Sequence, residues 1–546
     1  MKTSFRRLLA AIFAVSFFIL CLNGGCTGKT SPAEKPVSSS SEEVSPLRNL
    51  IPDQPGAAPN YFCTWAAQNF AQEKETSPRD HLTEQLVFEQ PGWISNYYQA
   101  VRGDLLVVFD DGWDIPLSAD GSQERWVFGS LELNEKRFPS IAGNPAERLR
   151  KLNDKVRAAG WRGAGLWVSA QAVGDGHDGK FMNDADLEKY WRQRARWSRQ
   201  AGIRYWKVDW GARDDRESFR RLLTRIAREE APELTIEHAA IIMPLNNWNG
   251  DGQFGSWPRE SGLARTFAPF SDVFRTYDVC AQIGTVTLLD RTGWILKNIS
   301  TEPGCQGLVN CEDEMYMGAA LGCTVGVMRH PLWRMSDPRN NDFPKYGHRI
   351  DEVTRAVRWM RLAPPFGRGG ESVYLSEQTL ADEWDFTEGQ TWYRDVIGKK
   401  VIQRASAITA RGIVPPEVVD AGDGVPFVVA SRNPNGAVAV AALQRTLPGG
   451  VIRTPRAQVK LKVGSVKHPI GIFGPYHTLT LEFDESIAQR RILAQDLAGD
   501  QAVEITNDVK REGRTVTLSG ELIDRVGLSA KTQDDLSEPG LVLRIE

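Results

Sequence analysis

A lysine and an aspartate lie two residues apart in the stretch Tyr-Trp-Lys-Val-Asp-Trp-Gly, which spans residues 205–211. The apolar run that begins at Ile203 predicts a strand through this stretch, followed by a helix. Because side chains alternate along a strand, Lys207 and Asp209 share one face. Such a pair is costly to bury in an ordinary core, whereas at a catalytic mouth the ammonium keeps the carboxylate ionised. We therefore interpret Asp209 as a nucleophile and Lys207 as the group that keeps it charged.

Polar side chains also stand at the ends of three other predicted strands. They are Asp110 and Asp111 after the second strand, Glu237 and His238 at the fifth, and Arg275 and Asp278 at the sixth. Each has a structural alternative when taken alone, because Asp-Asp-Gly forms turns and an aspartate can cap a helix. A lone Glu or His at a strand end is also often structural. Their shared placement at strand ends is what favours a functional site.

Asp209 and Asp278 could act as an opposed pair of carboxylates. Although they are distant in sequence, the ends of the fourth and sixth strands of a barrel face one mouth. Retaining glycoside hydrolysis uses such a pair about 5–5.5 Å apart. The ionised carboxylate attacks the anomeric carbon, and the protonated one donates its proton to the leaving oxygen. The pair therefore predicts Asp209 as nucleophile and Asp278 as acid/base.

These side chains need a fold that brings strand ends together. Short apolar runs alternate with amphipathic helical stretches from about residue 58 to 365, which is typical of βα units around a parallel sheet. The candidate strands are 61–65, 105–110, 165–170, 203–209, 234–237 and 273–278, with 295–299 and 324–329 as candidates for the remaining two. This α/β pattern predicts a (β/α)8 TIM barrel over residues 58–365, with its chemistry at the C-terminal strand ends.

The predicted helices carry clear start and stop signals. Asn144 can cap a helix that has a proline in its first turn and Glu147 three residues after the cap, and Gly160 follows its end. Asn183 similarly begins a helix that closes at Gly202.

The chain changes character after residue 365. Runs 425–430 and 437–443 are strand-like, and the sequence Asn-Pro-Asn-Gly at 433–436 between them indicates a hairpin. Further strand-like runs and few helical patterns follow. We expect a C-terminal antiparallel β-sandwich domain over residues 366–546.

The first residues read as an export signal. Basic residues precede the apolar run 8–22, and small residues then lead to Cys26, as in a bacterial lipoprotein processing site. We expect a lipoprotein-type signal peptide over residues 1–26, a flexible linker over 27–57 and a lipid anchor at Cys26, with simple secretion as the alternative. The predicted location is the bacterial periplasm or cell surface.

Composition and motifs exclude several classes of function. A net charge of -3 over 546 residues gives no electrostatic footprint for nucleic acid. There is no phosphate loop, dinucleotide fingerprint or zinc helix, so no cofactor and no metal are expected. The loop 175–179 lacks the ligand spacing of a calcium site and reads as a surface turn. Cys305 and Cys311 could pair, but we favour buried free thiols.

The ordered motifs resemble clan D glycoside hydrolases, the α-galactosidases of families 27 and 36. The motifs are Phe-Asp-Asp-Gly-Trp at 109–113, Tyr-Trp-Lys-Val-Asp at 205–209, Glu237, and the pair of Arg275 and Asp278. The resemblance covers residues 58–335 and implies Asp209 as nucleophile and Asp278 as acid/base. It further implies that substrate is bound by Trp65, Asp110, Asp111, Lys207, Glu237 and Arg275.

Departures from the family pattern leave the sugar open. The fifth strand has Ile-Glu-His where the family commonly has Cys-Glu-Trp, so His238 is expected to reshape the sugar pocket. Ile241 and Ile242 stand where an aromatic is expected. The arginine lies three residues before Asp278, whereas four is common in family 27.

We therefore expect a retaining exo-glycosidase that cleaves terminal α-galactosides of oligosaccharides or polysaccharides. An α-N-acetylgalactosaminidase or a β-L-arabinopyranosidase of the same clan is the near alternative. Glu237 argues against the first, since an acetamido group needs smaller neighbours. A non-catalytic carbohydrate-binding lipoprotein is the alternative from another class, although pure binding needs no opposed pair of carboxylates.

Overall fold

The computed structural model describes residues 47–71, 77–89, 92–117, 124–241, 257–276, 282–328, 349–387 and 396–546. Residues 47–546 form one compact unit. The predicted signal peptide, Cys26, most of the predicted linker and Asp278 lie outside the described residues. No helix within the described ranges is long and apolar enough to cross a membrane.

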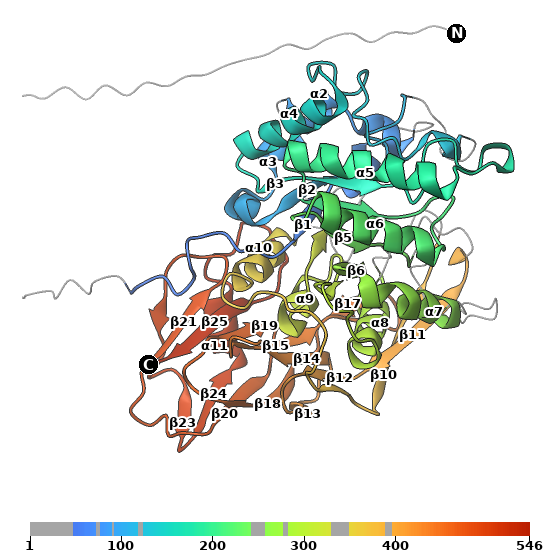
Figure 1. Cartoon of the computed structure of the whole chain (residues 1–546). Coiled ribbons are helices and arrows are strands. Elements are labelled where there is room, and N and C mark those ends of the chain that lie inside the picture. Colours follow the sequence, from blue (N-terminus) through green and yellow to red (C-terminus); the bar gives the residue numbers. More distant parts are fainter. Residues whose placement is uncertain are drawn as a thin grey trace, which may run out of the picture. The chain divides into compact units, whose positions relative to one another are not determined.

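Eight parallel strands form the barrel that the sequence predicts (Figure 1). They are β1 (Tyr61–Cys63), β2 (Leu106–Phe109), β3 (Gly163–Val168), β4 (Tyr205–Val208), β5 (Thr235–His238), β6 (Val273–Arg275), β7 (Leu308–Asn310) and β8 (Gly326–Val327). Each strand from β1 to β6 pairs with the next strand in sequence, and β8 pairs with β1. A parallel bridge between Asn310 and Thr324 joins the two remaining edges. The predicted α/β barrel is confirmed.

Helices surround the barrel strands. They are α1 (Trp65–Ala71), α2 (Glu84–Phe88), α3 (Trp93–Asn96), α4 (Pro145–Ala158), α5 (Asp184–Ala201), α6 (Glu217–Glu230), α7 (Trp257–Phe267), α8 (Gly284–Asn298), α9 (Met315–Leu321) and α10 (Ile350–Trp359). The predicted capping box of α4 is present, because Asn144 and Glu147 each accept the other's backbone N–H. The Asn183 cap of α5 is also present, and Gly202 ends that helix at a φ of 69°.

One predicted strand is wrong. The run Ile295–Ile299 belongs to the end of α8, and the seventh strand is Leu308–Asn310 instead. Eleven of the 15 residues of α8 are buried, and they include threonines and Arg291, so the helix shows no clear apolar face. A short apolar run of this kind cannot be assigned to a strand or a helix by periodicity alone.

The C-terminal half is rich in strands, as predicted. The elements are β9 (Val373–Leu375), β10 (Thr379–Asp385), β11 (Lys400–Ser406), β12 (Ile408–Arg411), β13 (Glu417–Asp420), β14 (Phe427–Arg432), β15 (Val438–Leu443), β16 (Arg445–Leu447), β17 (Val451–Arg453), β18 (Ala457–Gly464), β19 (Ile470–Phe473), β20 (Thr478–Phe483), β21 (Ile492–Asp496), β22 (Val503–Glu504), β23 (Lys510–Glu512), β24 (Thr515–Ser519), α11 (Gly520–Gly527) and β25 (Gly540–Ile545). An eight-stranded and a five-stranded sheet form its body. Most pairs are antiparallel, but β12–β14, β15–β19 and β18–β20 are parallel. The predicted hairpin joins β14 to β15, with Gly436 at a φ of 88°.

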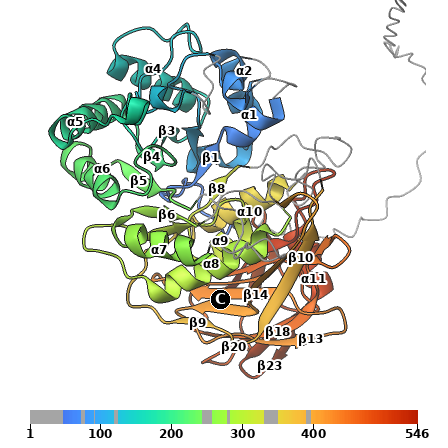
Figure 2. The same cartoon turned by 90° about the vertical axis from the view of Figure 1, so that its right-hand side faces the viewer.

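The barrel and the β domain share one hydrophobic core. Figure 2 shows α8, α9 and α10 on the side of the barrel that meets the β domain. Trp359 of α10 packs edge-on against Phe473 of β19, with ring centroids 6.1 Å apart. Beside them, Arg355 of α10 forms a buried ion pair with Asp496 of β21.

The end of the predicted linker is part of this unit. The backbone N–H of Leu50 donates to Gln495 at 2.7 Å, and that of Gly56 donates to Asp104 at 2.6 Å. Ile51 is buried. The linker expected over residues 27–57 therefore includes a segment that packs on both the β domain and the barrel.

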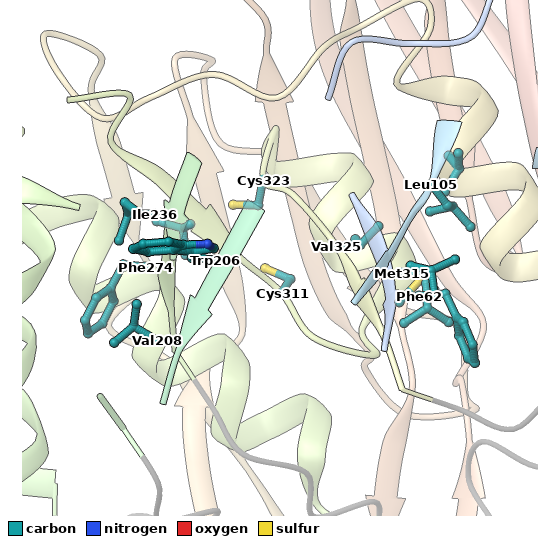
Figure 3. Packing of buried hydrophobic residues seen from close by; sticks show 14 of the residues in the cluster. Phe62, Leu105, Trp206, Val208, Ile236, Phe274, Cys311, Met315, Cys323 and Val325 are labelled. Carbon is teal, nitrogen blue, oxygen red and sulfur yellow. The ribbon is translucent and has the colours of Figure 1, made fainter. Parts of the chain in front are cut away.

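Side chains alternate between the barrel interior and the surrounding helices. The side chains of Trp206, Ile236 and Phe274 belong to the hydrophobic core between the barrel strands and the surrounding helices (Figure 3). Trp206 packs on Trp191 of α5 and donates to Ser198. This outward packing is what turns the other face of β4 toward the interior.

Cys311 and Cys323 lie in the same core and contact one another (Figure 3). Cys305, which could have paired with Cys311, lies beside Arg228 instead. The four cysteines in the described ranges are free thiols.

Candidate active site

The barrel interior carries a layer of polar side chains toward the C-terminal ends of its strands. The strand register pairs Trp167 of β3 with Lys207 of β4, and Lys207 with Glu237 of β5, so these three side chains stand at one level. Asp209 follows two residues beyond Lys207, and its carboxylate meets Arg275 from the end of β6. Residues on four strands are thus brought together.

The Asp209 carboxylate is held on two sides. Trp167 Nε1 donates to its Oδ2 at 3.2 Å, and Arg275 Nη2 lies 3.3 Å from its Oδ1. Its side chain keeps 11% of its surface exposed. Arg220 of α6 donates to the main-chain carbonyls of Val208 and Asp209 at 3.0 Å each, which fixes the end of β4. An oriented, partly exposed carboxylate of this kind can act as a nucleophile.

Lys207 contacts a different carboxylate from the one expected. Its Nζ donates to Asp110 Oδ2 at 3.0 Å, lies 4.0 Å from Glu312 and 3.7 Å from the Cys63 thiol. Among the described residues, the cation beside Asp209 is Arg275. The role predicted for Lys207, to keep Asp209 ionised, is therefore corrected: strand alternation gives the face of a side chain but not its neighbour across the barrel.

Asp110 and Lys207 form a charged pair inside the barrel. Burial opposes the charge of both groups, but each favours the charge of the other. The Lys207 ammonium, with hydrogen bonds from Cys63 and the backbone of Asp111, holds the pKa of Asp110 below its ordinary value against the effect of burial. Asp110 likewise outweighs burial and raises the pKa of Lys207 well above its ordinary value. Both groups are charged at neutral pH.

Asp111 is held by an arginine that the sequence analysis did not identify. Arg79, from the 3-10 helix Pro78–His81, donates through Nε and Nη2 to the two oxygens of Asp111 at 2.8 and 2.7 Å. Burial raises the pKa of Asp111 in spite of this cation. The guanidinium also stacks near Phe128 and Trp210, at 5.4 and 5.8 Å from the ring centres. No motif marked Arg79 in the sequence.

Glu237 lies inside the barrel and is closed from solvent. Its oxygens accept hydrogen bonds from Tyr61 at 3.1 Å, Tyr205 at 2.9 Å and Asn310 at 2.6 Å. Burial raises its pKa. The family resemblance predicts contact with a sugar hydroxyl, whereas the structure engages this carboxyl with protein donors. The predicted contact of Glu237 with the sugar stays a prediction.

His238 does not join the other predicted residues. Its ring is fully buried on the outer side of β5, where Nε2 lies 2.9 Å from Thr224 Oγ1 of α6 and the ring meets Phe270 edge-on. Burial and the nearby Arg220 lower its pKa well below the ordinary value. The predicted role in the sugar pocket is corrected, because strand alternation places Glu237 inward and His238 outward.

Glu312, on the turn after β7, is a second residue that sequence reasoning missed. Its carboxylate lies 3.5 Å from Arg275 Nη1 and accepts a hydrogen bond from Tyr61 at 3.1 Å. Glu312 lies two residues past the end of β7, a position typical of site residues in this barrel. The sequence did not predict β7, so this position could not be recognised.

Of the two remaining predicted site residues, the structure describes Trp65 but not Asp278. Trp65 begins α1 and is partly buried against the interior cluster that contains Trp167. Asp278, the predicted acid/base, lies outside the described residues, so its predicted role stays a prediction. In the 175–179 loop, His177–Gly179 form a 3-10 helix, and Arg213 binds both oxygens of Asp175 at 2.6 and 2.9 Å. Within the described ranges, no cluster of three or more His, Cys, Asp or Glu could hold a metal ion.

Comparison with known proteins gives matches among solved structures. No protein-family model and no curated protein matches the chain. The similar structures include α-galactosidase I from Mortierella vinacea, at 11% identity and a TM-score of 0.37 over 89% of this chain and 96% of that one. They also include a family 27 β-L-arabinopyranosidase from Geobacillus stearothermophilus, at 10% identity and 0.40 over 90% and 97%. A Saccharomyces cerevisiae α-galactosidase is similar at 11% and 0.36 over 90% and 98%.

Proposed function

We propose that the chain is a retaining glycoside hydrolase that removes terminal α-linked galactose-like sugars, with Asp209 as nucleophile. The observation that carries the proposal is the placement of the Asp209 carboxylate at the end of β4, oriented by Trp167 and Arg275 and partly exposed. Asp110 and Lys207 beside it supply charged groups that bind sugar hydroxyls well.

The reaction takes two steps. Asp209 attacks the anomeric carbon and forms a covalent glycosyl ester while Asp278 protonates the leaving oxygen. Asp278 then removes a proton from water, which attacks the same carbon and releases the sugar with its original anomeric configuration. The role of Asp278 comes from the sequence motif.

Release of nitrophenol from three substrates tests the proposal: an α-galactoside, an α-N-acetylgalactosaminide and a β-L-arabinopyranoside. We expect α-galactoside to be cleaved fastest. Asp209→Asn and Asp278→Asn should each lower turnover about a hundredfold or more. Asp154→Asn, a change to an exposed carboxylate on α4, is the matched control and should keep full activity.

The outcome also decides among the alternatives. Faster cleavage of either other substrate would reassign the sugar within the same reaction class. Undiminished activity in Asp209→Asn would refute the nucleophile. Tight galactose binding with no turnover of any substrate would favour a non-catalytic carbohydrate-binding protein.

A further inference from the structure

We infer that Glu312 is a positioning residue that orients the two cations of the site, Arg275 and Lys207. The inference rests on the proposed glycosidase function, because those cations contact the nucleophile and the charged group beside it. Glu312 itself is fully buried, so it acts on the reaction through its neighbours and not through the substrate.

The charges in the barrel interior alternate in sign. Asp110 lies 3.0 Å from Lys207, which lies 4.0 Å from Glu312. Glu312 in turn lies 3.5 Å from Arg275, which lies 3.3 Å from Asp209. The chain of contacts thus runs from one carboxylate to another through both cations, and Glu312 is its central member.

Glu312 separates two like charges. Its Oε1 faces Arg275 and its Oε2 faces Lys207, and Arg275 acts on Lys207 electrostatically, lowering its pKa. Two cations held near one another in a buried site repel strongly unless a counter-charge lies between them. The carboxylate supplies that counter-charge, and it lets each cation keep a second contact with Asp110 or Asp209.

The backbone fixes Glu312 in this place. Cys311 N–H donates to Thr324 O, and Asp313 N–H donates to Gly326 O, at 2.8 Å each. Asp313 adopts a left-handed φ of 57°, a conformation that aspartate adopts more readily than most residues with a side chain. Two backbone bonds to the strand β8 region therefore hold the turn on both sides of Glu312.

Other titratable groups in the barrel interior could also respond to pH. Among the described residues they include Tyr61 and Cys63 on β1, Asp110 and Asp111 after β2, Tyr205 and Lys207 on β4, Asp209 just past β4, Glu237 on β5 and Arg275 on β6, with Arg79 beside Asp111 and Arg220 beside Asp209. Tyr61, Cys63 and Tyr205 have pKa values raised well above their ordinary values, with burial as a major cause, so they stay neutral. The response to a charge change at Glu312 therefore falls mainly on the carboxylates and the two cations.

Glu312→Gln removes the charge while keeping the size of the side chain and an acceptor for Tyr61. Arg275 then keeps its contact with Asp209 but loses the competing charge of Glu312, and the tighter pair favours the ionised nucleophile. We expect the acidic limb of the kcat/KM profile to move to lower pH by about one unit. We also expect kcat to fall about tenfold or more, because a more tightly paired carboxylate attacks less readily, while KM changes less.

The experiment compares pH profiles of the wild type, Glu312→Gln and Glu314→Gln on the best nitrophenyl substrate. Glu314 is the matched control, since it is a buried carboxylate two residues away that accepts from Thr285. It should leave the acidic limb in place. An unchanged limb in Glu312→Gln, or an equal shift in Glu314→Gln, would overturn the inference.

A crystal structure of Glu312→Gln gives a readout that does not depend on activity. Arg275 Nη1 should leave residue 312 and approach Asp209, and an unmoved Arg275 would contradict the inference. A wild type that cleaves none of the substrates would refute the proposed function, and the position of Arg275 would still decide whether Glu312 orients it.

Discussion

The contacts of Asp209 show that the chemistry of a single residue depends on neighbours that are distant in the sequence. Strand alternation correctly predicted that Lys207 and Asp209 share one face of β4. The curvature of the barrel, however, brings Lys207 into contact with Asp110 and Asp209 into contact with Arg275. Both cations come from the ends of strands, as the sequence indicated. Which cation meets which carboxylate depends on closure of the sheet, and no local pattern encodes it.

Asp114 provides a pH-dependent test of a single buried carboxyl. It follows β2 and accepts from the backbone of Leu131 at 3.1 Å, and burial raises its pKa from 3.8 to about 6. Between these two pH values the folded protein binds a proton that the unfolded chain does not. This contribution to stability is therefore complete below about pH 4 and is lost as the pH rises through 6.

Asp114→Asn cannot ionise, so it should be more stable than the wild type at pH 7.5, by up to about 3 kcal/mol, and nearly equal to it at pH 4. Urea unfolding at the two pH values measures the difference. Asp154→Asn should follow the wild type at both, because this carboxylate is exposed. Parallel pH dependence of wild type and Asp114→Asn would contradict the burial argument.

Helix α6 holds the catalytic end of β4 through one side chain. Arg220 is almost fully buried, and burial lowers its pKa to about 10, yet it stays charged at neutral pH. It donates to the carbonyls of Val208, Asp209 and Asp214. The carbonyl of Val208, the last residue of β4, also accepts from the backbone N–H of Ala239 at 2.8 Å, and Arg220 adds a side-chain donor at this strand end.

Arg220→Met should remove one donor from each of these carbonyls and let Asp209 move. We expect a loss of about 2–4 kcal/mol in the free energy of unfolding and a fall of more than tenfold in kcat/KM. Arg225→Met on the same helix removes a surface arginine paired with Glu188 and Glu229, and it should cost less than about 1 kcal/mol. Equal losses in the two variants would show that Arg220 has no special role at β4.

The elements differ in how far their sequences predict them. The caps of α4 and α5 and the first six strands were predictable, because cap residues and apolar runs are local signals. The three-residue strand β7 and the mostly buried helix α8 were not, since neither has a readable period. Missing β7 also hid Glu312, so one error in an element became an error in the site.

The barrel and the β domain behave as one folded unit in this structure. Their shared core and the buried pair of Arg355 and Asp496, at 2.8 and 3.0 Å, link α10 to β21. Asp496 also accepts from the backbone of Ala498 and Ala530. Unfolding of either part would expose the apolar face of the other, so we expect one cooperative transition.

Asp496→Ala should destabilise the whole unit by about 3–5 kcal/mol, because Arg355 is left buried without its counter-ion. Thermal unfolding followed by tryptophan fluorescence and by far-ultraviolet circular dichroism should still give one shared midpoint, at a lower temperature. Arg491→Gln breaks the exposed pair with Glu504 and should shift the midpoint little. Separate midpoints for the two probes in the wild type would contradict a shared core.

The central claim is that Asp209 forms a covalent bond to the sugar. A slowly turned over fluorinated glycoside of the best substrate sugar should trap the glycosyl-enzyme, and peptide mass spectrometry then locates the label. We expect one sugar per chain, attached at Asp209 within the peptide that contains residues 205–211. A label on another carboxylate, or steady inactivation of Asp209→Asn by the same reagent, would contradict it.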